Sequence, residues 1–343
     1  MKIFYSEIHR NHEPPFEVFD GGLRTPYLEN PDRMDRILNA LKHTDWAEIL
    51  EPTDYGYDPI YAVHDKDYID FLASCWSEWL NSNPKDSSVL LPATFALRRH
   101  PQRPTSLLGR AGYYMMDLSA CIVAGTYKAA LASANCSLGA AEEVSNGARS
   151  AFALCRPPGH HAGKDYAGGY CFINNAAVAA NWLSSKGKVA LLDIDYHCGN
   201  GTQDIFYDRD DVLTISIHAD PNFEYPHYAG FANEKGAGTG LGFHKNFPLE
   251  KGTDEAEYFS TLEEALSLIR KFEPKYLVLS AGMDIYAHDP LGTIKVTTDG
   301  IGEIGKRISA LDLPTVIIME GGYANEDLGK NIVSLLGEFN ERL

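Results

Sequence analysis

Apolar runs of strand length alternate with stretches of helical period over the second half of the chain. The apolar runs cover 150–155, 188–192, 212–217, 276–280 and 315–319. Apolar positions of helical spacing cover 174–185, 261–272 and 299–311, and a final helix closes the chain. Because parallel strands are joined by helical crossovers, this alternation predicts an α/β fold with a mostly parallel sheet covered by helices on both faces.

The first half of the chain is less regular. We expect a strand from Lys2 to Tyr5, a helix that begins at Pro31, and helices over 67–80 and 124–145. Residues 9–30 and 82–109 are predicted to be loops, since prolines, glycines and polar runs interrupt every period. The second loop contains a basic tract, and a structureless segment of this length is usually functional or an interface. No linker or repeat divides the chain, so we expect one domain over 1–343.

Each predicted strand of the second half ends in polar or glycine-rich sequence. These endings lie at 156–161, 193–200, 282–284 and 321–323. Open α/β sheets build their sites at the carboxyl ends of parallel strands. We therefore expect the four endings to converge on one cleft.

Composition and charge narrow the choice of partner. The 343 residues are 44% hydrophobic and 22% charged, which is ordinary for a globular protein, and the formal net charge is −17. Binding to nucleic acid or to an anionic membrane surface is not expected. A cationic substrate would be attracted, although solubility or a salty cytosol also accounts for the charge. The six cysteines form no C-x-x-C pair, and no apolar run approaches about 18–20 residues. With no apolar leader at the N-terminus, we expect a cytoplasmic protein with reduced thiols.

A metal site is predicted where the run that begins at 188 ends. Asp193, Asp195 and His197 alternate there, so an extended chain directs all three side chains the same way. Asp195 and His197 are suitable ligands, and Asp284, which follows a strand and a glycine, is the natural third. Two carboxylates, one imidazole and an open position are typical of a catalytic site. Zn²⁺ fits best, although Fe²⁺, Co²⁺ and Mn²⁺ accept similar ligands.

Acid–base groups are predicted at two other strand ends. His160 and His161 follow Pro-Pro-Gly, and an imidazole titrates near neutral pH. Asp193 is expected to hold one ring nitrogen of His160, and Asn200 to orient His161 without adding a charge. Tyr323, after two glycines, is a candidate donor to a developing oxyanion.

Two other patterns do not predict a site. The glycines at 236, 238, 240 and 242 do not lie between a strand and a helix, which argues against phosphate binding. Cys155, Cys171 and Cys198 lie near histidines in the sequence. However, Cys155 belongs to an apolar strand, where a thiol stays protonated and inert, so a cysteine nucleophile is not expected.

Five motifs together resemble those of the histone deacetylase superfamily, and the resemblance covers nearly the whole chain. It implies the arginase/deacetylase fold, with a central, mostly parallel sheet of about eight strands, and hydrolysis of an N-acetyl amide. The motifs are Arg156-Pro157-Pro158-Gly159-His160-His161-Ala162, Gly168-Gly169-Tyr170-Cys171-Phe172-Ile173-Asn174-Asn175, Asp193-x-Asp195-x-His197, Gly199-Asn200-Gly201-Thr202-Gln203 and Gly321-Gly322-Tyr323.

Matched position by position, the resemblance implies a role for each motif residue. Zn²⁺ would be bound by Asp195, His197 and Asp284. His161 would act as general base and then as general acid, and Tyr323 would donate to the oxyanion.

Further roles follow from the same resemblance. His160 would be the electrostatic neighbour of His161, Gly169 would offer its backbone near the substrate, and Tyr170 would form a wall of the tunnel. A structural K⁺ would be held by the carbonyls of Asp193, Asp195, His197 and Ile217 and by the hydroxyl of Ser216.

Within the superfamily the chain is most similar to the bacterial acetylpolyamine amidohydrolase branch. That branch implies a homodimer formed through the segment at about 82–109, which narrows the channel. Tyr225 would be the second aromatic wall opposite Tyr170. Glu17 and Asp117 are candidates for recognising the substrate cation, although Ser119 stands where an acidic residue is expected. Cys198 stands where the superfamily usually has histidine, and it receives no role.

Three alternatives remain open. A protein acetyl-lysine deacetylase would use the same chemistry, but the long segment at 82–109 disfavours a bulky peptide. A binuclear manganese ureohydrolase would need a second aspartate at 286, which is Tyr286. A non-catalytic protein that binds acetylated ligands would be expected to lack a ligand, the paired histidines or Tyr323, and this chain has all of them.

Overall fold

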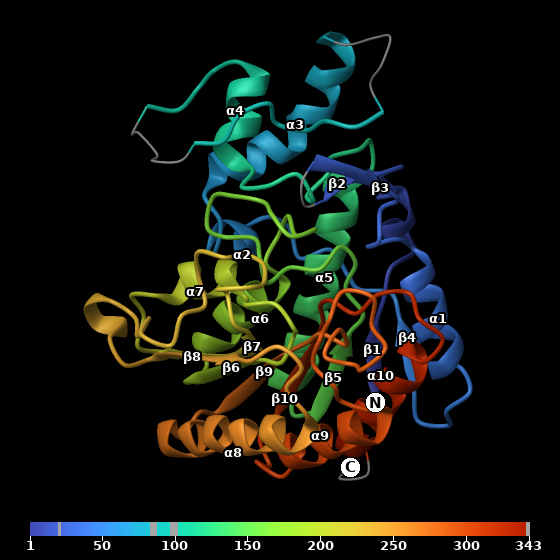
Figure 1. Ribbon diagram of the computed structural model, residues 1–343, viewed down its shortest axis with the longest axis vertical. Helices are drawn as coiled ribbons and strands as arrows, with labels where there is room; N and C mark the ends of the chain where they lie inside the picture. Colours follow the sequence, from blue (N-terminus) through green and yellow to red (C-terminus); the bar gives the residue numbers. More distant parts are fainter. Residues whose placement is uncertain (20–21, 83–87, 97–101, 341–343) are drawn as a thin grey trace.

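The computed structural model describes residues 1–19, 22–82, 88–96 and 102–340. Its centre is an eight-stranded sheet in which every neighbouring pair of strands is parallel (Figure 1). Across the sheet the strands are β4 (Glu48–Leu50), β1 (Lys2–Phe4), β5 (Ser150–Ala153), β10 (Thr315–Met319), β9 (Tyr276–Ala281), β6 (Val189–Asp193), β7 (Val212–Ala219) and β8 (His244–Leu249). The predicted parallel architecture is confirmed.

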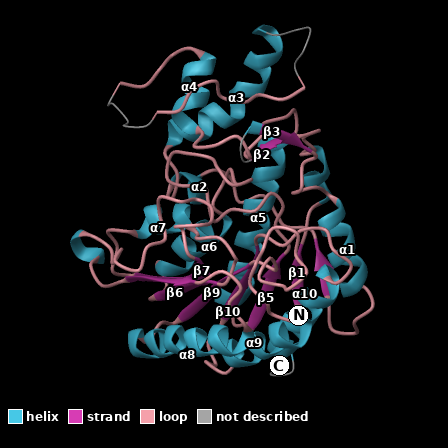
Figure 2. Ribbon diagram, in the orientation of Figure 1, coloured by secondary structure: helices cyan, strands magenta, loops and turns pink. Residues whose placement is uncertain are grey.

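Helices cover both faces of this sheet, as the alternation predicts (Figure 2). The first group comprises α2 (Asp58–Tyr61), α3 (Lys66–Ser82), α4 (Leu107–Tyr114), α5 (Thr126–Ser145), α6 (Asn175–Ser184) and α7 (Asn200–Phe206). The second group comprises α1 (Asp32–Leu41), α8 (Glu255–Phe272), α9 (Thr298–Ser309) and α10 (Leu328–Asn340).

Each group packs on its own face because side chains alternate along a strand. In β6, Val189 and Leu191 belong to the core beneath the first group. Ala190 and Leu192, between and after them, belong to the core beneath the second group. Strands buried on both faces carry apolar residues at nearly every position, which is why the sequence shows continuous runs rather than alternation.

Several short elements differ from the prediction. Residues 9–30 contain part of the 3₁₀ helix η1 (Glu7–Asn11) and an antiparallel pair, β2 (Glu17–Phe19) with β3 (Leu23–Thr25). Strand β8 and the 3₁₀ helix η3 (Gly238–Gly240) lie where the sequence analysis expects no element. Elements of three residues carry too little periodicity to be recognised in sequence.

Helix ends also differ. Helix α8 begins six residues before the predicted 261, because the carboxylate of Asp254 accepts a hydrogen bond from the backbone N–H of Glu257 at 3.1 Å and caps the helix. Helix α4 begins inside the segment 82–109, and residues 83–87 and 97–101 of that segment lie outside the described residues. None of the described helices is long and apolar enough to cross a membrane.

The carboxyl ends of β5, β6, β9 and β10 meet at one edge of the sheet, as predicted. There they border a cavity of ≈ 620 Å³, whose lining includes His161, His197 and Tyr323. Parallel topology therefore brings residues that are up to 162 positions apart in sequence to one site.

Candidate active site

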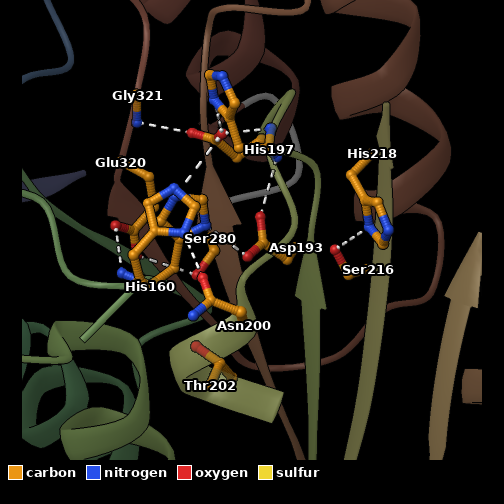
Figure 3. Close-up of polar contacts among 12 residues, drawn as sticks. His160, Asp193, His197, Asn200, Thr202, Ser216, His218, Ser280, Glu320 and Gly321 are labelled. Carbon is orange, nitrogen blue, oxygen red and sulfur yellow. Dashed lines mark hydrogen bonds and ion pairs between the residues drawn. The ribbon is translucent and has the colours of Figure 1, made fainter. Parts of the chain in front are cut away.

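The turn after β5 presents His160, which is labelled in Figure 3, and the next residue, His161. Its backbone is held by Glu320, which follows β10. One carboxylate oxygen of Glu320, Oε2, accepts hydrogen bonds from the N–H groups of Gly159 at 2.7 Å and His160 at 3.1 Å. The other oxygen accepts from the hydroxyl of Ser280 at 3.1 Å. The sequence analysis did not single out Glu320, although a carboxylate at the end of a buried strand is a signal that could have found it.

The two imidazoles have different partners. Nδ1 of His160 lies 2.9 Å from Oδ2 of Asp193, whereas Nδ1 of His161 lies 2.7 Å from Oδ1 of Asn200. Both pairs were predicted to be in contact, and the structure brings both together. Because an amide oxygen only accepts, Nδ1 of His161 carries the hydrogen and Nε2 is left unprotonated when the ring is neutral.

The surroundings shift the pKa values of the two imidazoles in opposite directions. Burial disfavours the charged form of His160, but the carboxylates of Asp195 and Asp193 outweigh it and raise the pKa of His160 well above its ordinary value. Burial, together with the neighbouring His160 and His197, lowers the pKa of His161 well below its ordinary value. The arrangement thus favours a charged ring beside a neutral one.

Asp195, His197 and Asp284 form a buried cluster whose potential ligand atoms all lie within 4.8 Å of one another. Nδ1 of His197 is 3.4 Å from Oδ1 of Asp195 and 3.2 Å from Oδ2 of Asp284. Close packing forms this cluster, since a Cβ on Gly282 would lie 2.1 Å from Oδ2 of Asp195. The same oxygen accepts the backbone N–H of Gly321 at 2.8 Å.

The donor set fits a divalent cation. Oδ2 of Asp284 is buried, and its 3.2 Å contact with Nδ1 of His197 lacks the geometry of a hydrogen bond. Burial and the charge of Asp195 raise the pKa of Asp284 to about 7. Burial alone would lower the pKa of His197, yet its contacts with Asp195 and Asp284 raise that pKa to about 10. A pair of buried carboxylates with an orphan oxygen favours positive charge at this point, as a bound metal ion would supply.

Aromatic rings form the sides of the cavity above this cluster. Tyr225 packs edge-on against His161 with ring centroids 4.9 Å apart, and Tyr170 packs against Tyr323 with centroids 5.8 Å apart. Tyr170 has a φ of 67° and follows Gly169, whose φ is 51°, so this pair of residues adopts the left-handed conformation. All of these predicted residues line the cavity.

A buried arginine supports the segment that carries Tyr323. Arg33, on α1, donates from Nε to the carbonyl of Gly322 at 2.6 Å and also donates to the carbonyl of Glu320. Arg33 pairs with the carboxylate of Glu29 at 2.6 Å, which also pairs with Arg156 at 2.9 Å. The backbone N–H of Tyr323 donates to Oδ2 of Asp289 at 2.7 Å. The sequence analysis did not identify Arg33, since in sequence it is an ordinary member of an amphipathic helix.

The two carboxylates expected to recognise a substrate cation lie in different places. Asp117 lines the cavity, as does Ser119. Glu17 does not, because it is fully buried behind Tyr170. Its Oε2 accepts the hydroxyl of Tyr170 at 2.7 Å and its Oε1 accepts the N–H of Leu28 at 3.0 Å. The structure therefore does not bring Glu17 to the cavity.

The residues expected to hold K⁺ lie at and just after the end of β6 and inside the neighbouring strand β7. Asp193 of β6 pairs with Ser216 of β7, and Ile217 follows. The hydroxyl of Ser216 lies 2.7 Å from Nδ1 of His218.

Cys198 and His218 both pack against Gly230. A Cβ added to Gly230 would lie 2.7 Å from Nε2 of His218 and 3.0 Å from Sγ of Cys198. Burial raises the pKa of the Cys155, Cys171 and Cys198 thiols. This direction agrees with the expectation that none of these thiols is a nucleophile.

Comparison with known proteins identifies similar chains over almost the full length. The histone deacetylase domain matches residues 27–339. Acetylpolyamine amidohydrolase 2 of Pseudomonas aeruginosa is 45% identical, covering 99% of this chain and 98% of the relative. Acetylpolyamine amidohydrolase 1 of the same organism is 46% identical, with 98% of each chain covered. The crystal structure of acetylpolyamine aminohydrolase from Burkholderia pseudomallei superposes with a TM-score of 0.95 at 43% identity, covering 99% and 98% of the two chains.

Proposed function

The chain belongs to the histone deacetylase family and is a hydrolytic deacetylase, and we propose that its substrates are small N-acetylated polyamines or diamines. It would hydrolyse compounds of the acetylputrescine, acetylcadaverine or acetylspermidine type to the free amine and acetate. Relatives named as acetylpolyamine amidohydrolases, at 45% and 46% identity, support this substrate class. The net charge of −17 favours a cationic substrate.

One observation carries the proposal. His161, His197 and Tyr323 line the same cavity, and the aromatic side chains of Tyr170 and Tyr225 flank its approach to them. Such a cavity suits a slender alkyl amide whose acetyl end reaches the buried cluster.

Asp195, His197 and Asp284 would hold a divalent ion, with Zn²⁺ the best fit and Fe²⁺, Co²⁺ or Mn²⁺ as alternatives. When bound, such an ion supplies Lewis-acid chemistry, which polarises an acetyl carbonyl and lowers the pKa of water. A structural K⁺ would be held at the carbonyls of Asp193, Asp195, His197 and Ile217 and at the hydroxyl of Ser216.

His161 is suited to move the protons. Asn200 fixes its Nδ1 hydrogen, so Nε2 can take a proton from water and later return it to the leaving amine. A charged His160, held by Asp193, disfavours a resting charge on His161 and keeps it ready to act as a base.

Tyr323 and Gly169 would position and stabilise the reacting amide. The hydroxyl of Tyr323 would donate to the oxyanion that develops on the acetyl oxygen. The backbone of Gly169 would contact the substrate beside Tyr170. We also propose that the chain forms a homodimer through the segment at about 82–109 and acts in the cytoplasm.

A substrate comparison at defined metal content tests the proposal. We expect kcat/KM for acetylputrescine, acetylcadaverine or acetylspermidine to exceed that for an acetyl-lysine peptide. A higher value for the peptide would favour the protein deacetylase alternative. A protein that binds metal but turns over none of these compounds would favour the non-catalytic alternative. The molar mass in solution, measured by light scattering, tests the homodimer.

A further inference from the structure

The described residues 114–119, which begin at the last residue of α4, lie between the loop that carries Tyr170 and the loop that carries Tyr225. On one side, the N–H of Ala167 donates to the carbonyl of Tyr114 at 2.7 Å, and the N–H of Met116 donates to the carbonyl of Ala167 at 2.9 Å. On the other side, the hydroxyl of Tyr228 donates to Sδ of Met116 at 2.8 Å. The segment is thus bonded to the Tyr170 loop and to the Tyr225 loop at once.

Asp117 links the two loops through a single atom. A single oxygen, Oδ2, accepts the backbone N–H of Gly169 at 2.7 Å and the phenolic O–H of Tyr225 at 2.6 Å. Two groups that donate to one atom cannot move apart without breaking a hydrogen bond. Asp117 therefore ties the side chain of Tyr225 to the backbone of Gly169, the residue before Tyr170.

The second oxygen of Asp117 is also occupied. Oδ1 accepts the N–H and the hydroxyl of Ser119, both at 3.0 Å, and the N–H of Ala120 at 3.2 Å. Five donors meet one carboxylate, which offers about four lone-pair sites. A substrate ammonium group would have to displace one of these donors in order to bind Asp117 directly.

The two groups held by Oδ2 both contact His161. A Cβ on Gly169 would lie 2.2 Å from Cδ2 of His161, so the backbone of Gly169 packs directly on that ring. Tyr225 packs against the same ring from another side. Displacing either group would alter the space in which an acetyl amide meets His161.

We propose that Asp117 is a positioning residue that sets the width of the substrate channel, and that it thereby selects acetamides whose carbon chain is unbranched next to the amide nitrogen. The proposal rests on the deacetylase function proposed above. It assigns Asp117 a role other than direct recognition of the substrate cation.

The test compares D117N, Y225F and the double variant with the wild type on two substrates of matched length. N-acetylputrescine ends in an ammonium group, and N-pentylacetamide ends in a methyl group instead. The asparagine retains one acceptor oxygen, but its NH₂ cannot accept from Gly169 or Tyr225. Y225F removes only the hydroxyl and keeps the ring.

If Asp117 positions the channel, D117N lowers kcat/KM for both substrates by the same factor, about tenfold or more. Y225F should have a smaller effect of the same kind, and the double variant should be no worse than D117N, because the two residues act through one bond. A loss with D117N confined to N-acetylputrescine would overturn the proposal in favour of direct cation recognition. Effects that multiply in the double variant would also overturn it.

A branched probe provides a readout that loss of stability alone would not change. The probe is an N-acetyldiamine with a methyl group on the carbon beside the amide nitrogen. We measure the ratio of its KM to the KM for N-acetylputrescine. We expect this ratio to be high in the wild type and lower in D117N and Y225F. An unchanged ratio would contradict the proposal. If D117N does not fold, Y225F alone decides.

The substrate class is tested separately in the wild type. There, the kcat/KM for N-acetylputrescine divided by the kcat/KM for N-pentylacetamide shows whether a cationic end is preferred. If the wild type prefers an acetyl-lysine peptide, the proposed function fails. The positioning role is then judged on that peptide. It holds if D117N and Y225F each lower kcat/KM and the double variant is no worse than D117N.

Discussion

Nδ1 of His161 lies 2.7 Å from the amide oxygen of Asn200, so an uncharged group orients this ring, whereas the carboxylate of Asp193 holds its neighbour His160. The two adjacent histidines are therefore held in opposite electrostatic states by residues from the same stretch of chain. A neutral orienting partner leaves His161 able to accept a proton near neutral pH.

Replacing Asn200 by aspartate should move the pH profile of the enzyme. A carboxylate at this position favours the imidazolium and would raise the pKa of His161 by about one to three pH units. Activity requires the unprotonated ring, so the rise of kcat/KM with pH should shift to higher pH in N200D. N200A, which removes the acceptor without adding charge, should lower kcat without that upward shift. Superimposable N200D and wild-type profiles would count against His161 as the base.

Tyr323→Phe removes the hydroxyl and keeps the ring. If that hydroxyl donates to the oxyanion, kcat should fall by about 10²–10³. Metal content, measured by elemental analysis, should stay at the wild-type level, because Tyr323 is not among the clustered ligand atoms. An unchanged kcat would remove Tyr323 from the mechanism.

Removal of metal should destabilise the wild type but change D284N little, so that the stability order of the two proteins reverses. A chelator should abolish wild-type activity and lower the thermal midpoint, because bound metal stabilises the folded state. D284N should bind metal poorly. In the metal-free state, however, it should be at least as stable as the wild type, since burial and Asp195 disfavour the charge on Asp284. Thermal midpoints with and without chelator, alongside metal content, test this reversal.

Stability should decrease in mild acid, partly because of His64. Its Nε2 accepts the backbone N–H of Asn174 at 2.9 Å, and its Nδ1 lies 2.8 Å from the carbonyl of Gly163, so the native ring is neutral. Burial lowers the pKa of His64 to about 4, against about 6.5 in the unfolded chain. The unfolded state therefore binds more protons between these values. The contribution of His64 is complete above about pH 6.5 and is lost as pH falls toward 4.

At pH 5 the loss from His64 amounts to about 2 kcal/mol. Urea unfolding at pH 7 and pH 5 should show a smaller difference for H64Q than for the wild type. Equal differences would mean that His64 does not contribute. The lowered pKa values of His218 and His244, both about 4 because of burial, should add acid sensitivity in both proteins.

Glu320→Gln should damage both stability and catalysis. The amide retains one acceptor oxygen, so it cannot accept from the two backbone N–H groups at Oε2 and from Ser280 at Oε1 together. Leaving a buried donor unpaired costs about 1–3 kcal/mol, and the turn that carries His160 and His161 would lose support. S280A removes only the hydroxyl donor and should have a milder effect on the thermal midpoint and on kcat. Equal effects of the two variants would contradict this role of Glu320.

The sequence by itself determined the architecture and the floor of the site, by which we mean the residues that follow the strands at the base of the cavity. Continuous apolar runs such as 315–319 are typical of strands buried on both faces, and the structure has β10 at Thr315–Met319. Because parallel strands end at one edge, the polar endings at His160, Asp195, Asp284 and Tyr323 had to converge. Local spacing was sufficient because each of these residues lies within seven residues of the end of a strand.

Only the tertiary structure decided what surrounds that floor. Glu17 and Asp117 were equal candidates in sequence, yet Glu17 lies behind Tyr170, 153 positions away, and Asp117 joins Gly169 to Tyr225 across the channel. Their places depend on loops and on the short strand β2, which lack a periodic pattern. The direction in which a carboxylate faces is set by donors that are distant in sequence, and that pairing exists only once the chain has folded.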